Sequence, residues 1–220
     1  MRSCVKAFYV WMQTGYEYLY NMNYLAHAYF SFNDPGILVG NIISDFVKGR
    51  KKFDYPVEIQ AGIMLHREID HYTDHHPATR EAKEFFRPHY RLYSGAFIDV
   101  VYDHFLATDT DVFDETTLFE FSQQVYQSLE RYKTWLPPGF ASMFPYMRSQ
   151  NWLYNYRLPG GAEKSFHGIA RRALYISETD TAARLFREHY QPLKECYRHF
   201  WKDAVPYIEN QYRLLKGTGE

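Results

Sequence analysis

The sequence contains only two cysteines, Cys4 and Cys196, which are too few for a disulfide framework and match no paired zinc motif. This scarcity favours a reducing compartment, and we expect a cytoplasmic protein. No apolar run approaches the roughly 18 residues needed to span a bilayer, and residues 1–21 lack the pattern of a signal peptide. The formal net charge of −1 gives little overall attraction to nucleic acid, so we expect no nucleic-acid partner.

Strand signals are also scarce, whereas helix starts and stops are frequent. The chain has 220 residues, of which 46% are hydrophobic, and it shows no linker, internal repeat or low-complexity tract. This composition suits one globular domain. We expect an all-α, single-domain helical bundle with helices near residues 37–48, 56–75, 77–87, 88–108, 114–135 and from 180 to the C-terminal region, the last bent at Pro192 and Pro206.

Two pairs of polar residues share a helical spacing. His66 and Asp70 are four residues apart, and Asp99 and Asp103 repeat that spacing, so each pair lies on one face of a predicted helix. A histidine and an aspartate at this spacing also form ordinary hydrogen bonds. The two aspartates have apolar neighbours, which predicts a cation, an arginine or a histidine as partner unless they lie at a solvated edge.

His27 and Asp45 are lone polar residues in apolar segments further upstream. Taken singly, each is better explained as a satisfied core histidine or a capping aspartate. Together with the two helical pairs they form a mixed nitrogen and oxygen donor set that suits manganese, magnesium, iron or zinc. Such a site can lower the pKa of bound water and neutralise a phosphoryl oxygen.

Five ordered segments carry a family resemblance: MNYLAHAYFSF, GNIISDFVKG, GIMLHREIDHYTDHHP, REAKEFFRP and FIDVVYDHFL. They resemble the bacterial acyl carrier protein phosphodiesterases, a distorted branch of the HD-type metal-dependent phosphohydrolases, from Met22 to about Arg213. The resemblance implies an α-helical fold related to the HD domain and a divalent metal, manganese first. It also implies hydrolysis of the phosphodiester between 4'-phosphopantetheine and a serine of holo acyl carrier protein.

The same resemblance implies a set of site residues. The sequence has no adjacent His-Asp dipeptide, and we expect the His66 and Asp70 spacing to replace it. We expect four residues to hold the metal, namely His27, His66, Asp70 and Asp103. Asp45 and Asp99 either complete the metal's shell or orient its histidines. Arg67 either stabilises phosphoryl oxygens or pairs with Asp70 or Glu68, and His104 is a candidate general acid.

Basic residues recur in two places that could bind an acidic carrier protein. A stripe at spacings of three and four holds Arg80, Lys83, Arg87 and Arg91, provided that Pro88 only bends its helix. A second patch holds Lys48, Arg50, Lys51 and Lys52. Such patches could steer docking, although a solvated helix face explains the stripe equally well.

Two other functions fit parts of the pattern. A phosphohydrolase acting on nucleotides would share the metal centre, and a helical binding protein could hold a structural metal whose coordination is complete. Residues 1–21 precede the resemblance and show no strong amphipathic period. We expect them to be a poorly ordered extension, and a chain beginning at Met22 to keep full activity as one domain over residues 22–215.

Overall fold

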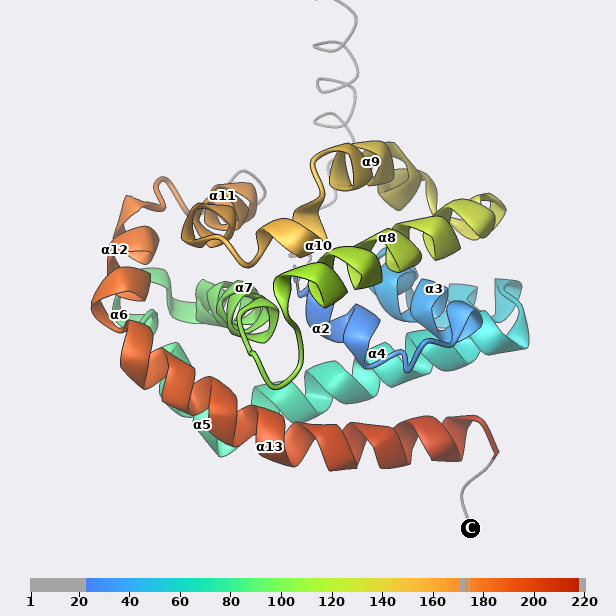
Figure 1. The fold of residues 1–220 in the computed structure, drawn as a ribbon, viewed down its shortest axis with the longest axis horizontal. Helices are drawn as coiled ribbons and strands as arrows, with labels where there is room; N and C mark the ends of the chain where they lie inside the picture. Colours follow the sequence, from blue (N-terminus) through green and yellow to red (C-terminus); the bar gives the residue numbers. More distant parts are fainter. Residues whose placement is uncertain (1–22, 171–172, 174, 218–220) are drawn as a thin grey trace, which may run out of the picture.

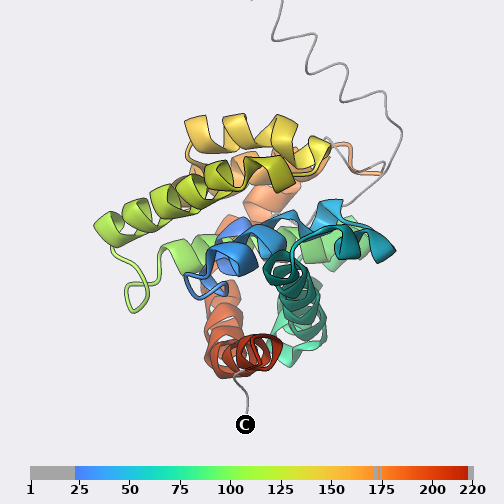
Figure 2. The ribbon, with the colours of Figure 1, turned by 90° about the vertical axis from the view of Figure 1, so that its right-hand side faces the viewer.

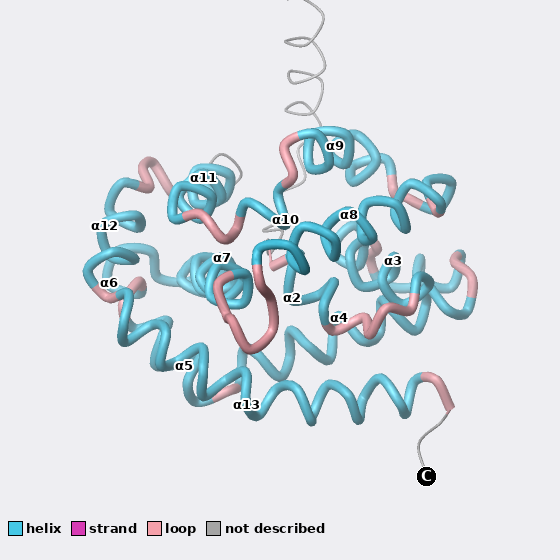
Figure 3. Tube along the Cα trace, in the orientation of Figure 1, coloured by secondary structure: helices cyan, strands magenta, loops and turns pink. Residues whose placement is uncertain are grey.

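The computed structural model describes residues 23–170, 173 and 175–217. Within these ranges every regular element is helical (Figures 1 and 3). The all-α fold class predicted from the sequence is therefore confirmed. The α-helices are α2 (Tyr24–Tyr29), α3 (Pro35–Ile43), α4 (Val57–His75), α5 (Pro77–Glu84), α6 (Arg87–Tyr90), α7 (Ser94–Ala107), α8 (Glu115–Arg131), α9 (Pro138–Ser149), α10 (Trp152–Asn155), α11 (Pro159–Ala170), α12 (Asp180–Glu188) and α13 (Tyr190–Leu215). The described residues also form the short 3-10 helices η1 (Ser44–Phe46), η2 (Gly49–Asp54), η3 (Arg91–Tyr93) and η4 (Lys133–Trp135).

Helix α7 lies at the centre of the bundle, and all of its residues except Gly95 are buried. The long helix α13 runs along one side, where it packs against α4 and α5 (Figure 1). Helices α8 and α9 lie on the opposite side, and the short helix α2 is enclosed between these layers (Figure 2). The core therefore surrounds α2 and α7 and is filled largely by aromatic and branched aliphatic side chains.

Helices α3 and α4 pack closely against each other, and two glycines permit it. A Cβ atom at Gly40 would overlap the carbonyl oxygen of Ile59, and one at Gly62 would overlap the carbonyl oxygen of Ile37. The two backbones are therefore in direct contact. One turn after Gly62 along α4 comes His66, which this contact brings beside the end of α3.

Several predicted helix limits are wrong. The predicted helix over 37–48 ends at Ile43, where the 3-10 helix η1 follows, and Gly49 at the start of η2 has a positive φ of 52° that an α-helix does not contain. The predicted helix over 88–108 is interrupted before Ser94, where Arg91 has a φ of 48°. The predicted C-terminal helix is divided into α12 and α13. By contrast, Asp114 caps α8 as expected, through a capping box with Thr117.

Residues 1–22 lie outside the described part of the chain, and with them the predictions about the leader and about a start at Met22. Among the described helices, none combines the length and apolar character that crossing a membrane requires.

Candidate metal centre

Three side chains from two helices converge on one point. His27 on α2 and His66 and Asp70 on α4 each offer a ligand atom, and these atoms lie within 4.8 Å of one another. Oδ1 of Asp70 is 3.3 Å from Nε2 of His27, and Oδ2 of Asp70 is 3.1 Å from Nε2 of His66. The four-residue spacing on α4 therefore does what was predicted and places His66 and Asp70 side by side.

Asp45 reaches the same point from η1. Its Oδ1 is 3.3 Å from Nε2 of His66, the nitrogen that Asp70 also contacts. The side chains of Asp45 and Asp70 are 22% and 27% exposed, whereas both histidine rings are buried. The carboxylates therefore form the solvent-facing side of the cluster, and the imidazole rings form its inner wall.

The two imidazole rings stack on each other, with centroids 4.0 Å apart and an angle of 17° between their planes. Burial and the neighbouring His66 lower the pKa of His27. Burial alone would lower the pKa of His66 as well, but the carboxylates of Asp70 and Asp45 outweigh it and raise that pKa to about 10. Burial alone would raise the pKa of Asp70, but His66 and His27 hold it well below its usual range.

The donor set fits a divalent cation. Nε2 of His27 is buried, and no hydrogen-bond partner within the described residues satisfies it. It lies 3.3 Å from a carboxylate oxygen of Asp70, and when the proton of the neutral ring is on Nδ1 the two electron-rich atoms face each other. A cation held between them would satisfy both, and two imidazoles with carboxylates form a donor set that several divalent metals accept.

Asp103 does not join this cluster in the structure, and its predicted role as a ligand stays a prediction. Its Oδ2 accepts a hydrogen bond from the backbone N–H of Leu25 at 3.0 Å, and its Oδ1 accepts one from that of Ala26 at 2.9 Å. These are orphan donors in the first turn of α2, where Asn23 provides no side-chain cap. Asp103 is completely buried and caps α2 from the neighbouring helix α7.

Asp99 lies one turn before Asp103 and is also buried. With Ile69 and Thr73 of α4 it lines a small cavity of about 10 Å³, and its carboxyl accepts no hydrogen bond within the described residues. Burial raises the pKa of Asp99 well above its ordinary value, and the nearby charge of Asp70 raises it further. Asp99 is therefore a neighbour of the cluster rather than part of it, and its predicted role stays a prediction.

The role of general acid predicted for His104 stays a prediction, and in the structure both ring nitrogens contact other residues. Its Nδ1 is 2.8 Å from the backbone oxygen of Tyr156, and its Nε2 is 3.0 Å from the hydroxyl of Tyr190. The ring is buried and packs edge-on against Phe186. Burial lowers its pKa. One nitrogen contacts the residue that follows α10 and the other contacts the first residue of α13, so His104 connects both regions to α7.

Arg67 follows His66 on α4 and is partly buried. Its guanidinium donates a hydrogen bond of 3.4 Å to the backbone oxygen of Val47, two residues after Asp45. The structure shows no ion pair between Arg67 and Asp70 or Glu68, the alternative partners expected from the sequence. Arg67 therefore reaches the segment that carries Asp45.

The two predicted basic surfaces differ in the structure. Lys48, Arg50 and Lys51 are exposed at η2, directly after the segment that carries Asp45. The stripe is wrong as a continuous surface, because α5 ends at Glu84 and α6 begins only at Arg87. Its charges are also engaged within the chain. Lys83 is only 14% exposed and pairs with Asp74 at 2.7 Å, while Arg87 pairs with Glu84 at 3.1 Å, and Arg80 and Arg91 remain exposed.

One residue next to the cluster was missed from the sequence. Asn41 of α3 is fully buried and contacts both histidines. The sequence feature that could have identified Asn41 is its position as the one amide in the apolar run ILVGNII. Burying an unpaired polar side chain there would cost free energy of folding, so a partner could have been expected.

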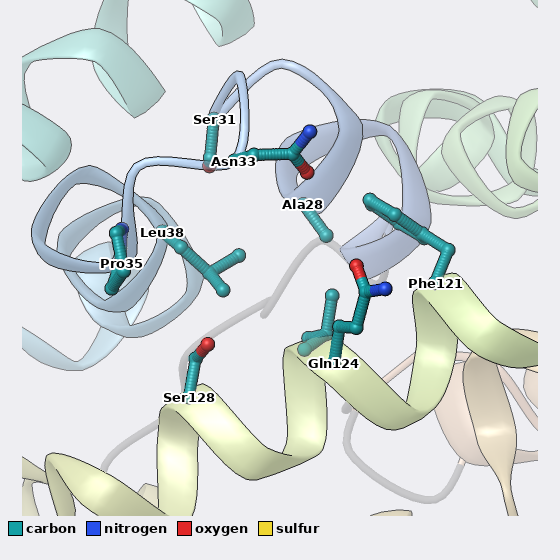
Figure 4. A pocket seen from close by; sticks show the side chains of 9 residues that line it. Ala28, Ser31, Asn33, Pro35, Leu38, Phe121, Gln124 and Ser128 are labelled. Carbon is teal, nitrogen blue, oxygen red and sulfur yellow. The ribbon is translucent and has the colours of Figure 1, made fainter.

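A separate cavity of about 80 Å³ lies between α3 and α8 (Figure 4). Its lining includes the apolar side chains of Leu38, Phe121 and Val125, and the polar side chains of Ser31 and Ser128 lie on opposite sides of it (Figure 4). None of the clustered residues lines it. The cavity therefore does not form part of the candidate metal centre.

Comparison with known proteins gives a consistent result. Residues 22–204 match the family model described as acyl carrier protein phosphodiesterase. An acyl carrier protein phosphodiesterase of Yersinia pestis is 35% identical over 182 residues, which cover 82% of this chain and 94% of that protein. One from Enterobacter sp. (strain 638) is 30% identical over 191 residues, which cover 86% of this chain and 99% of that protein. No solved structure matches the chain.

Proposed function

The chain belongs to the acyl carrier protein phosphodiesterase family, and on that basis we propose that it hydrolyses the phosphodiester between 4'-phosphopantetheine and a serine of holo acyl carrier protein. The supporting observation in the structure is the convergence of His27, His66 and Asp70 beside the partly exposed carboxylate of Asp45. Family and site agree, because hydrolysis of a phosphodiester is chemistry that a divalent metal assists.

In this proposal His27, His66 and Asp70 hold a divalent metal, and Asp45 either joins them or orients His66. Manganese is the metal proposed first, and magnesium, iron or zinc would also suit nitrogen and oxygen donors. When bound, such a metal polarises a phosphoryl oxygen and makes water a better nucleophile at neutral pH.

The exposure of the clustered side chains indicates the side from which the substrate reaches the candidate metal centre. Asp45 and Asp70 are the exposed members of the cluster, so the substrate phosphodiester approaches from their side. Arg67 reaches this side through its hydrogen bond to Val47. Its guanidinium has further N–H groups in a planar fork, which can donate to the phosphoryl oxygens and hold them against the cluster.

The exposed basic residues of η2 are proposed to receive the carrier protein. Lys48, Arg50 and Lys51 follow Asp45 along the chain, so a carrier bound there presents its prosthetic group near the cluster. Acyl carrier proteins are acidic in general, and opposite charge speeds encounter and fixes orientation. A cytoplasmic location fits this partner and stays a prediction.

The direct test is to incubate the purified protein with holo acyl carrier protein and to measure the mass of the carrier. With manganese present we expect conversion to apo carrier and release of 4'-phosphopantetheine. Parallel reactions with a chelator, and with magnesium, iron or zinc in place of manganese, identify the metal. His66→Ala should lose both turnover and metal binding, whereas Arg131→Glu, a surface change at the end of α8, serves as a folded control.

Nucleotides and other small phosphoesters are assayed alongside the carrier. Hydrolysis of a nucleotide with no change in the carrier would replace the proposed substrate while retaining the metal centre. Equal metal content in wild type and His66→Ala would contradict the assignment of the cluster itself.

A further inference from the structure

Asn41 is a completely buried amide beside the candidate metal centre. It lies in the last turn of α3, one residue after Gly40, where that helix touches the backbone of α4. Four hydrogen bonds converge on this one residue, two through its side-chain nitrogen, one through its side-chain oxygen and one through its backbone oxygen. Four hydrogen bonds at one residue of an otherwise apolar helix indicate that Asn41 has a specific structural role.

The bonds of the amide nitrogen fix which way the side chain points. Nδ2 of Asn41 donates to the backbone oxygen of His27 at 2.8 Å and to Oγ of Ser31 at 3.2 Å. Oγ of Ser31 in turn donates to the backbone oxygen of His27 at 2.8 Å. With the nitrogen held in this way, Oδ1 is the atom that faces the imidazole of His27.

Oδ1 of Asn41 lies 2.7 Å from Nδ1 of His27. An amide oxygen can only accept, so the neutral ring carries its proton on Nδ1 and donates to Asn41. The lone pair is then on Nε2, the buried atom that faces Asp70. A free neutral imidazole prefers the opposite arrangement, with the proton on Nε2.

The backbone of the same residue acts on His66. Nδ1 of His66 lies 2.7 Å from the backbone oxygen of Asn41, which also can only accept. Carbonyl groups in the last turn of a helix generally lack partners within that helix, so this oxygen is available for the ring. The Nε2 atom of His66 is thereby directed at Asp70 and Asp45.

We propose that Asn41 is a positioning residue that fixes the orientation of both imidazoles and keeps their Nε2 atoms available for a metal. Its side chain sets the tautomer of His27, and its backbone oxygen sets the orientation of His66. The consequence for turnover rests on the proposed function, but the tautomer of His27 is a property of the metal-free protein and can be measured without any substrate.

The test uses the full chain with ring nitrogens of histidine labelled with nitrogen-15, free of metal, in mildly alkaline buffer. We expect the NMR spectrum of the wild type to show the proton of His27 on Nδ1. Asn41→Leu, which has nearly the same size but cannot accept, should move that proton wholly or partly to Nε2. It should also weaken manganese binding, measured by calorimetry, by about 10- to 100-fold.

Two further variants separate positioning from packing. Asn41→Asp keeps an acceptor beside Nδ1 and should retain the wild-type tautomer, although it loses the donor bonds to His27 and Ser31. Ser31→Ala removes a partner of the amide nitrogen but leaves the contact between Asn41 and His27 intact, so it should also retain the tautomer.

The proposal is overturned if the wild type carries the proton of His27 on Nε2, a result that requires no variant to fold. It is also overturned if Asn41→Leu keeps both the wild-type ring spectrum and the wild-type metal affinity. Failure of the carrier assay with the expected tautomer present would reject the proposed substrate and leave the role of Asn41 standing.

Discussion

Replacing Asp103 with alanine separates the two roles that this residue could have, metal ligand or helix cap. In the structure its two oxygens accept backbone hydrogen bonds from Leu25 and Ala26, and the side chain is completely buried. Asp103→Ala leaves both donors without a partner inside the protein. An unsatisfied buried donor costs about 1–3 kcal/mol, so two cost on the order of 4 kcal/mol.

That cost is large for a protein of this size. Since 1 kcal/mol shifts the melting temperature by about 2–4 °C at roughly 150–250 residues, we expect Asp103→Ala to lower it by roughly 8–16 °C. The assay is thermal unfolding of the metal-free protein, followed by far-ultraviolet circular dichroism in the presence of a chelator. A metal ligand would behave differently, because its removal changes metal affinity and leaves the stability of the metal-free protein nearly unchanged.

Asp99→Asn is the matched control. It changes the other buried carboxyl of α7, one turn away, which accepts no hydrogen bond within the described residues, and its effect on melting should be much smaller. The capping role is refuted if metal-free Asp103→Ala melts with the wild type while its manganese affinity falls more than about 100-fold. Asp103 would then return to the ligand set implied by the family resemblance.

Three further predictions test other parts of the structure. KM of the wild type for the carrier should rise steeply with salt, and charge reversal of Arg50 and Lys51 together should raise KM several-fold, whereas Arg80→Glu should not; the reverse pattern would move docking to α5. His104→Gln should lower the melting temperature but keep metal affinity, and loss of metal at unchanged stability would contradict its structural role. Asp34→Ala should cost about 1–2 kcal/mol at neutral pH, because Asp34 caps α3. Burial alone would raise the pKa of Asp34, but bonds from Lys216 and the α3 backbone lower it. The contribution of Asp34 to the free energy of unfolding is therefore complete above its unfolded pKa of about 3.9, and it disappears as the pH falls through the lower folded pKa. Denaturant titrations should consequently give the wild type and the variant the same stability in acid.

The sequence predicted the helical fold and one half of the site for a clear reason. A spacing of four residues on a single helix fixes the relative position of two side chains, and His66 and Asp70 accordingly lie 3.1 Å apart. The same rule placed Asp99 and Asp103 on one face of α7. It could not indicate which neighbouring element would meet that face.

The contacts that the sequence did not predict share this cause. Asp103 meets the first turn of α2, and His104 meets Tyr156 and Tyr190, which are distant in sequence. Asn41 was overlooked because its importance depends on the close approach of α3 and α4, which the two glycines permit but their spacing does not reveal. Contacts between elements, rather than within them, decide these roles.

The direct contact between α3 and α4 also bears on how the centre would accommodate ions of different radius. At Gly40 and Gly62 there is no side chain whose rotation could let the two helices move apart by a small step. The imidazole of His66 is held against that contact and therefore has little freedom to follow a larger or smaller ion. Asp45 and Asp70 are partly exposed and can change rotamer or switch from one coordinating oxygen to two. The carboxylates, rather than the imidazoles, would therefore move to suit the radius of the ion. Substitutions at Asp45 should alter the preference among metals more than the ability to bind one.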